Sequence, residues 1–111
     1  MDGFQETFPI ERAELERLLG SGNEHAIIDA LLSAAYYDTD WRWVQATCLR
    51  FLDHEERSLR QIAATCLGHI ARIHRQLDVE VVMPRLVALQ SDPAVNVEDA
   101  IDDIQLFVRP H

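Results

Sequence analysis

Four acidic residues near the carboxyl end of the chain are the best placed to do chemistry together. On a helix, the spacing of Glu98-Asp99 and Asp102-Asp103 puts Asp99 on one face with Asp102 and Asp103. Such carboxylates could ligate a hard cation, but the segment has neither the loop glycine nor the alternating oxygen ligands of a calcium loop. We therefore expect no metal site but a hydrated acidic face, on which Glu98, Asp99, Asp102 and Asp103 meet basic side chains of a protein partner.

The histidines are scattered, which argues against a zinc site. They are His25, His54, His69, His74 and His111. His69 and His74 are five residues apart, so a helix would turn them away from a shared face. For His69 two roles stay open, a hydrogen bond within the stack of helices or contact with a partner.

Catalytic motifs are absent from the sequence. It has no Gly-rich phosphate loop, no GxSxG, no HExxH and no cysteine near a candidate base. Catalytic groups can also come together from distant positions, and a buried carboxylate or a strongly shifted titration of His69 would indicate such a site. The sequence favours a protein that is not an enzyme and uses no cofactor.

Two aromatic residues are candidate anchors for a partner, because exposed Trp and Tyr are enriched at interfaces. In a helix whose core stripe includes Val44, Trp43 points to the outer side. Tyr37 ends the preceding helix, just before the turn that leads to Trp43. The alternative is that the region around Tyr37 and Trp43 packs against the amino-terminal segment around Phe4 and Phe8 instead of contacting a partner.

Charge and hydropathy limit the classes of partner. Nineteen acidic and ten basic side chains give a net charge of -9 over 111 residues, which repels phosphate backbones and anionic lipids. We expect no nucleic-acid or membrane partner, whereas a basic protein would meet this chain faster. The longest apolar runs fall far short of the roughly 20 residues that span a bilayer. The amino terminus lacks the layout of a secretory signal, so we expect a cytoplasmic protein.

Apolar residues recur with helical spacing, and no segment alternates as a strand does. Six helices are expected, over Ile10–Leu19, Glu24–Tyr37, Trp41–Leu52, residues 57–74, Val79–Gln90 and from just after Pro93 to about Val108. Asn23, Asp40 and Asp78 are expected to cap three of them. Cys48 and Cys66 lie among apolar neighbours on two helices, which predicts buried free thiols.

The helices repeat with a period of 37 residues. The matched columns are Leu15/Leu52/Leu89, Ala26/Ala63/Ala100, Ala30/Leu67/Ile104 and Ala34/Ala71/Val108. A fixed period indicates units that each bury an apolar face against the next, and small residues let neighbouring helices approach. The expected fold is all-α, one domain over residues 1–111, with three antiparallel helix pairs at about residues 10–37, 41–75 and 78–108.

Residues 49–68 resemble the core of a HEAT repeat. The matching features are leucines, an acidic turn, an apolar–Arg pair, Ala-Ala and Leu-Gly, carried here by Leu49, Leu52, Asp53, Glu55, Glu56, Leu59-Arg60, Ala63-Ala64 and Leu67-Gly68. The next unit is similar, with Pro84 where the first helix of a HEAT repeat often bends, although Val97-Glu98 replaces the apolar–Arg pair. The resemblance implies a short α-solenoid of HEAT-like hairpins, with Arg60 reaching the turn at Asp92.

The same stretch of the chain suggests a function. Small stand-alone HEAT-like proteins of this kind, with Leu-Gly-His-Ile-Ala-Arg-Ile-His at residues 67–74, resemble bacterial immunity proteins that accompany polymorphic or contact-dependent toxins. The resemblance implies a protein-binding module that neutralises a basic toxin domain by occupying its active cleft. The alternative is a HEAT-repeat scaffold or regulatory subunit of a larger assembly, including a homodimer formed through an open end repeat.

Overall fold

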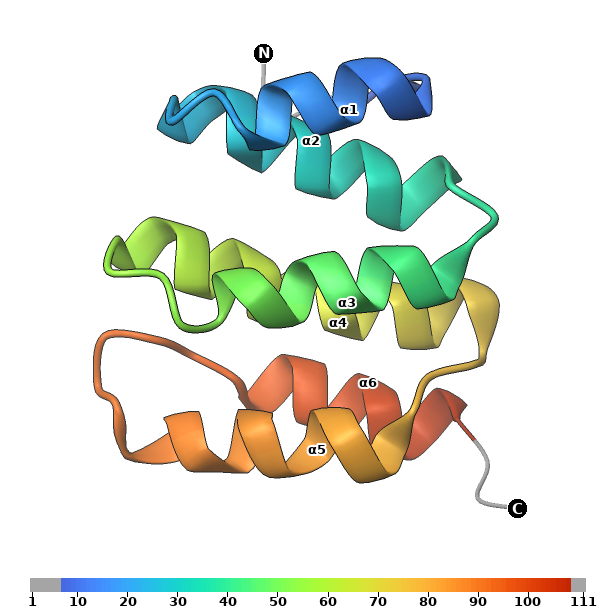
Figure 1. Cartoon of the computed structure of the whole chain (residues 1–111). Helices are drawn as coiled ribbons and strands as arrows, with labels where there is room; N and C mark the ends of the chain where they lie inside the picture. Colours follow the sequence, from blue (N-terminus) through green and yellow to red (C-terminus); the bar gives the residue numbers. More distant parts are fainter. Residues whose placement is uncertain (1–6, 109–111) are drawn as a thin grey trace, which may run out of the picture.

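The computed structural model describes residues 7–108, and the fold in this range is all-α, as expected. The helices are α1 (Arg12–Leu19), α2 (Glu24–Tyr37), α3 (Trp41–Phe51), α4 (Arg57–His74), α5 (Val79–Ala88) and α6 (Glu98–Phe107), with a 3₁₀ turn η1 (Leu89–Ser91) after α5. Consecutive helices run in opposite directions and pair into three layers (Figure 1). Together they form a compact body. None of the described helices is both long and apolar enough to cross a membrane.

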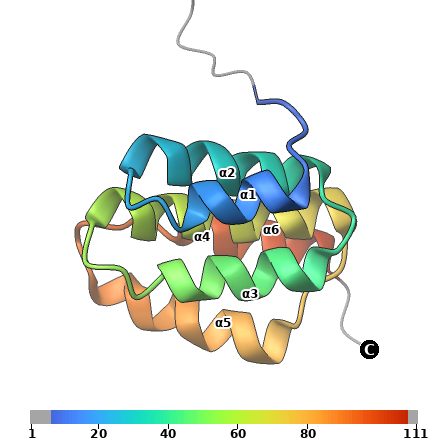
Figure 2. The ribbon, with the colours of Figure 1, turned by 45° about the horizontal axis from the view of Figure 1, so that its top comes forward.

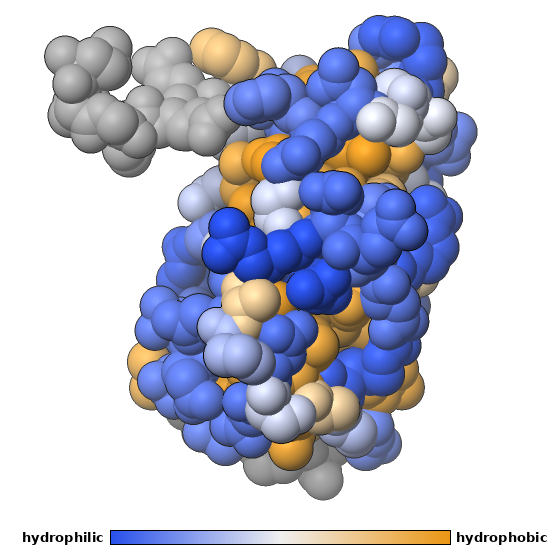
Figure 3. Space-filling model, turned by 90° about the vertical axis from the view of Figure 1, so that its left-hand side faces the viewer, coloured by the Kyte–Doolittle hydropathy of each residue, from blue (hydrophilic) through white to orange (hydrophobic). Residues whose placement is uncertain are grey.

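The odd-numbered and even-numbered helices lie on opposite sides of the molecule. Helices α1, α3 and α5 form one side, and α2, α4 and α6 form the other (Figure 2). We call these the odd-helix face and the even-helix face. The turns within the helix pairs gather at one end, where the surface is mostly hydrophilic with apolar atoms visible between the layers (Figure 3).

Helix α2 begins and ends where the sequence predicts, whereas α6 begins later than expected, at Glu98. The reason is a turn around Asp92, whose backbone carbonyl accepts a hydrogen bond from Val95 N and whose side chain accepts one from Ala94 N. This turn directs Val95 and Val97 into the core before the helix starts. Val97 is the N-cap residue, so the helix begins only at Glu98.

Two of the three expected helix caps are confirmed. The side chain of Asn23 accepts a hydrogen bond from Ala26 N at 3.0 Å, and that of Asp40 accepts one from Trp43 N at 3.2 Å. Asp78 stands at the start of α5 but its carboxylate does not cap the helix. It accepts a hydrogen bond from Gln45 instead. The expectation for Asp78 was therefore wrong, because its carboxylate is bonded to Gln45 of the neighbouring helix pair.

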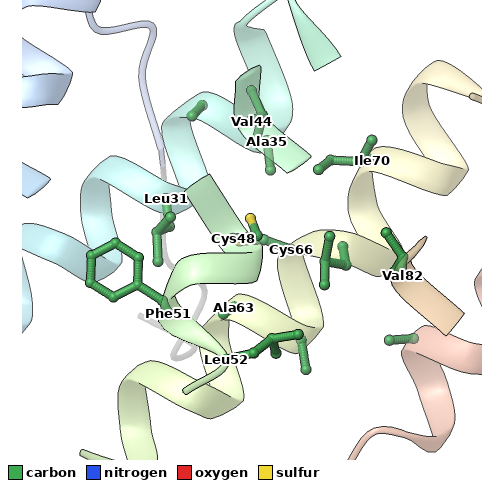
Figure 4. Close-up of a cluster of buried hydrophobic side chains, with 14 of the residues drawn as sticks. Leu31, Ala35, Val44, Cys48, Phe51, Leu52, Ala63, Cys66, Ile70 and Val82 are labelled. Atoms are coloured by element: carbon green, nitrogen blue, oxygen red, sulfur yellow. The ribbon is translucent and has the colours of Figure 1, made fainter. Parts of the chain in front are cut away.

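The core is built around α4, which packs against α2, α3 and α6. Side chains from α2, α3, α4 and α5 converge there (Figure 4). Cys48 and Cys66 are free and fully buried, as predicted. The hydrogen bond with the Cys48 thiol, together with burial, raises the pKa of the Cys66 thiol well above its usual range. Ile73, near the end of α4, is exposed.

Close approach of α4 and α6 depends on small residues. A Cβ atom added at Gly68 would lie 3.1 Å from Ala100 Cα and 3.2 Å from Asp103 Oδ2. Ala100 belongs to one of the alanine columns of the 37-residue period, and it is buried. The small residues at this crossing therefore bring the exposed faces of α4 and α6 next to each other.

Arginine–aspartate pairs connect neighbouring elements. Arg12 reaches Asp38 at 3.1 Å, Arg85 reaches Asp53 at 2.8 Å and Arg60 reaches Asp92 at 3.5 Å. The pair with Asp92 confirms that Arg60 reaches the Asp92 turn, as expected. Arg60 also donates to the backbone carbonyls of His54 and Glu55. Each pair holds a loop or helix end against another part of the chain.

Two glutamines bind loops through paired hydrogen bonds. Gln45 donates to Asp78 Oδ2 at 3.0 Å and accepts from Asp78 N at 2.8 Å. Gln61 donates to Asn96 O at 2.9 Å and accepts from Asn96 N at 2.7 Å. The side chain of Gln45 is buried and that of Gln61 is half-buried.

Replacing Gln45 by alanine should lower the free energy of unfolding by about 1–3 kcal/mol, because both groups of Asp78 lose a partner beside the core. Urea unfolding followed by circular dichroism measures this difference. Gln61→Ala is the matched control, and its smaller burial should give a smaller loss. Equal losses for the two variants would show that burial does not strengthen the Gln45 contact.

Candidate partner-binding surface

A groove on the even-helix face lies between α4 and α6. It has a volume of about 410 Å³ and is lined by Gln61, Thr65, His69, Arg72, Asn96, Asp99, Ala100, Asp102 and Asp103. Four residues predicted to bind a partner meet here, namely His69, Asp99, Asp102 and Asp103. They come together because α4 and α6 cross closely at Gly68.

The acidic side of the groove comes from α6, which has four acidic residues and no basic one. Ala100, Ile101 and Ile104 turn inward, which leaves Asp99 and Asp102 exposed and Asp103 half-buried at the rim of the groove. The expected acidic face of α6 is therefore present. Among the described residues, no cluster of three or more His, Cys, Asp or Glu side chains could hold a metal ion.

Glu98 differs from the other three acids. Its carboxylate accepts a hydrogen bond from Gln90 Nε2 at 3.1 Å, and it does not line the groove. Its backbone N–H donates to Asn96 Oδ1 at 3.0 Å. Glu98 thus contacts the connection between α5 and α6, apart from the other predicted acids.

His69 lies on α4, the middle helix of the even-helix face, and lines the groove. Its ring lies 4.9 Å from that of Tyr36, measured between centroids, and its Nδ1 lies 2.6 Å from Arg72 NH2. Because a guanidinium can only donate, Nδ1 must accept, which assigns the neutral tautomer with its proton on Nε2. Burial and then Arg72 lower the pKa of His69, while Asp103 opposes them. Hydrogen bonding within the stack, one of the two predicted roles, is therefore present.

Acidification should destabilise the protein partly through His69. Its pKa in the fold is lowered below the usual value of about 6.5, so the unfolded chain takes up the proton first as the pH falls through that value. The free energy of unfolding should then decrease between pH 6.5 and the lower folded pKa. His69→Gln lacks this contribution and should lose less stability over that range. Parallel unfolding curves of both proteins from pH 8 to pH 5 measure it, and equal losses would contradict the assignment.

An aromatic corner adjoins the groove at the end of α2. Tyr37 is 47% exposed, and its ring centroid lies 6.3 Å from that of Tyr36. The Tyr37 hydroxyl donates to Thr7 O at 3.0 Å, and Ser33 Oγ donates to Phe8 O at 2.6 Å. The segment at residues 7–8 is thus bound along α2, and it fixes the exposed Tyr37 in place.

Trp43 is less exposed than predicted. It is half-buried against the core, and the Arg12 guanidinium carbon lies 3.8 Å from its ring centroid. Arg12 is itself held by Asp38. Trp43 was expected to lie on the outer side of its helix, but an arginine of α1 covers its ring. Phe8 is exposed and bound to α2, and Phe4 lies outside the described residues.

Comparison with known proteins gives the chain its family. No protein-family model and no curated protein matches it. Among solved structures, a chain in the crystal structure of a CDI complex from Cupriavidus taiwanensis LMG 19424 is 41% identical, with a TM-score of 0.86 and a match covering 96% of this chain and 98% of that chain. The chain belongs to the family of this CDI-complex protein.

Several residues of the candidate surface of this chain were not predicted from its sequence. They are Tyr36, Gln61, Thr65, Arg72 and Asn96. Two of them carried a usable signal, because Tyr36 precedes the predicted Tyr37, and Arg72 lies three residues after His69 on one helix face. The other three are ordinary polar residues whose position depends on how the helices pack.

Proposed function

We propose that this protein is the immunity protein of a contact-dependent inhibition system, which binds and neutralises a cognate toxin. The observation that carries the proposal is the 41% identity to a chain of a CDI complex over nearly the full length of both chains. The toxin would meet it in the cytoplasm. Inhibition by binding requires no catalytic group and no cofactor, since the bound protein need only block the toxin.

The binding surface that we propose includes Tyr37, His69, Asp99, Asp102 and Asp103. A net charge of -9 favours a basic toxin domain, because opposite charges speed encounter and favour the correct orientation. Tyr37 offers an exposed ring whose hydroxyl is already bonded, so little side-chain entropy is lost when a partner covers it. Trp43 and Glu98, which the sequence also suggested, lie outside the groove.

We further propose that the helix pairs are HEAT-like repeats in a short α-solenoid. Support comes from the 37-residue period, the contact between Arg60 and Asp92 and the position of Pro84 inside α5. In such repeats the even-numbered helices would be the second helices, whose surface binds other proteins.

Co-expression with the toxin domain encoded beside its gene tests the proposed function. We expect the protein to restore growth of cells that make the toxin, and to elute with it as a stoichiometric complex that weakens at high salt. The related but non-cognate toxin of another system serves as the control and should not be neutralised. Recovery of only the protein itself, or of a multi-subunit assembly, would favour the scaffold alternative and contradict the proposal.

A further inference from the structure

The aromatic side chains of α3 offer little surface to a partner. Trp41 and Phe51 are buried in the core, and Trp43 is half-buried. The Arg12 guanidinium carbon lies 3.8 Å from the Trp43 ring centroid, a cation–π contact that covers this ring. A partner that binds Trp43 would have to displace Arg12.

On the even-helix face, Tyr37, Tyr36 and His69 form a row of rings from α2 to α4. Arginines contact some rings here too: Arg72 bonds to His69, and Arg75 lies 5.2 Å from the ring centroid of Phe107 on α6. Within residues 7–108, no cation–π contact forms at Tyr36 or Tyr37. A partner can therefore cover the exposed Tyr37 without displacing a cation.

The charge of the two faces also differs. Helices α1, α3 and α5 together carry five arginines and three acids, whereas α2, α4 and α6 carry three arginines and six acids, four of the acids on α6. Elsewhere the chain uses aspartates to bind arginines, but within residues 7–108 no ion pair forms at Asp99, Asp102 or Asp103. Arg72 lines the same groove and bonds to His69 instead. The charge of these aspartates remains available to an external cation.

The even-helix face has grooves at the boundaries between helix pairs. Besides the groove between α4 and α6, a second groove of about 360 Å³ is lined by Ile28, Arg57, Ser58, Gln61, Ile62 and Ala94. Gln61 lines both grooves. The face therefore offers an apolar hollow and an acidic hollow on either side of α4, a combination that suits a protein surface with basic and apolar side chains.

We infer that the even-helix face, and not the odd-helix face, binds the toxin, with the basic side chains of the toxin against Asp99, Asp102 and Asp103 and its apolar contacts along Tyr36 and Tyr37. The inference rests on the proposed function. It deepens that function by assigning one face and by excluding Trp43 from the interface.

Two double variants with the same change of charge test the face. Asp99→Lys with Asp102→Lys alters the even-helix face, and Glu16→Lys with Glu80→Lys alters the odd-helix face, all four being exposed positions. Association rates with the purified toxin domain are measured at low and high salt, after circular dichroism has shown that each variant is folded. We expect the even-face pair to slow association by about tenfold or more and to reduce its salt dependence, and the odd-face pair to change the rate by less than about threefold.

A pair of uncharged variants separates steric from electrostatic effects. Thr65→Trp places a bulky ring in the groove, and Ala46→Trp places the same ring on the exposed part of α3. Thr65→Trp should weaken binding at least tenfold, whereas Ala46→Trp should not. Equal or larger effects from the odd-face variants, or no effect from either face while the wild type still neutralises, would overturn the assignment. A wild type that fails to bind would overturn the proposed function and this inference with it.

Discussion

Replacing Leu67 by alanine should lower the free energy of unfolding by about 2–5 kcal/mol. Leu67 is fully buried on α4, the helix that packs against α2, α3 and α6, so the cavity would open where three helices meet. A loss of this size is a large part of the roughly 5–15 kcal/mol that stabilises a domain. Urea unfolding, with thermal unfolding as a second measure, gives the difference.

Leu106→Ala is the matched control for this cavity. Leu106 is 73% exposed on α6, so its truncation removes the same atoms without opening a cavity and should change the free energy by less than about 0.5 kcal/mol. A small effect of Leu67→Ala, close to that of the control, would mean that the helices around α4 collapse into the cavity.

Replacing Gly68 by leucine should destabilise the protein by about 3 kcal/mol or more, because the new side chain would separate α4 from α6. Even a Cβ atom at this position would lie 3.1 Å from Ala100 Cα. Gly68→Ala should stay within about 1 kcal/mol of the wild type, since the gain in helix propensity offsets the crowding. Chemical unfolding of the two variants gives the comparison.

Ala46→Leu shows what the leucine side chain does on an exposed helix position. Ala46 lies on α3 and is exposed, so the free energy of unfolding should change by less than about 0.5 kcal/mol. If Gly68→Leu were tolerated equally well, the close approach of α4 and α6 at Ala100 would not be needed for stability. Toxin binding by Gly68→Ala would then report whether the groove keeps its shape.

The helices were predictable because their signals are local. Apolar spacing, Gly20 and Gly22 before α2, and the capping side chains of Asn23 and Asp40 act over a few residues. The late start of α6 was not predictable, because it depends on burial of Val95 and Val97 beneath other helices. Propensity near Pro93 favours a helix, and the core overrides it.

The candidate site likewise has features that local sequence predicts and features that depend on packing between helices. The acidic face of α6 follows from helical spacing alone, and so does the direction of Trp43. The contact between Arg12 and Trp43 joins two helices, α1 and α3. The proximity of His69 to Asp103 depends on the close crossing of α4 and α6 at Gly68. Contacts between distant parts of a chain leave no periodic signal in a single sequence.

By itself, the sequence determined that the chain is helical, acidic and internally repeated, and that α6 has one acidic face. These properties depend on residue type and on the 3.6-residue turn. Only the tertiary structure decided which aromatic rings are covered by arginines, which helices border the groove, and that Asp99, Asp102 and Asp103 form no ion pair within residues 7–108. The physical reason is that packing between helices, set by small residues such as Gly68 and Ala100, brings together side chains that are far apart in the sequence.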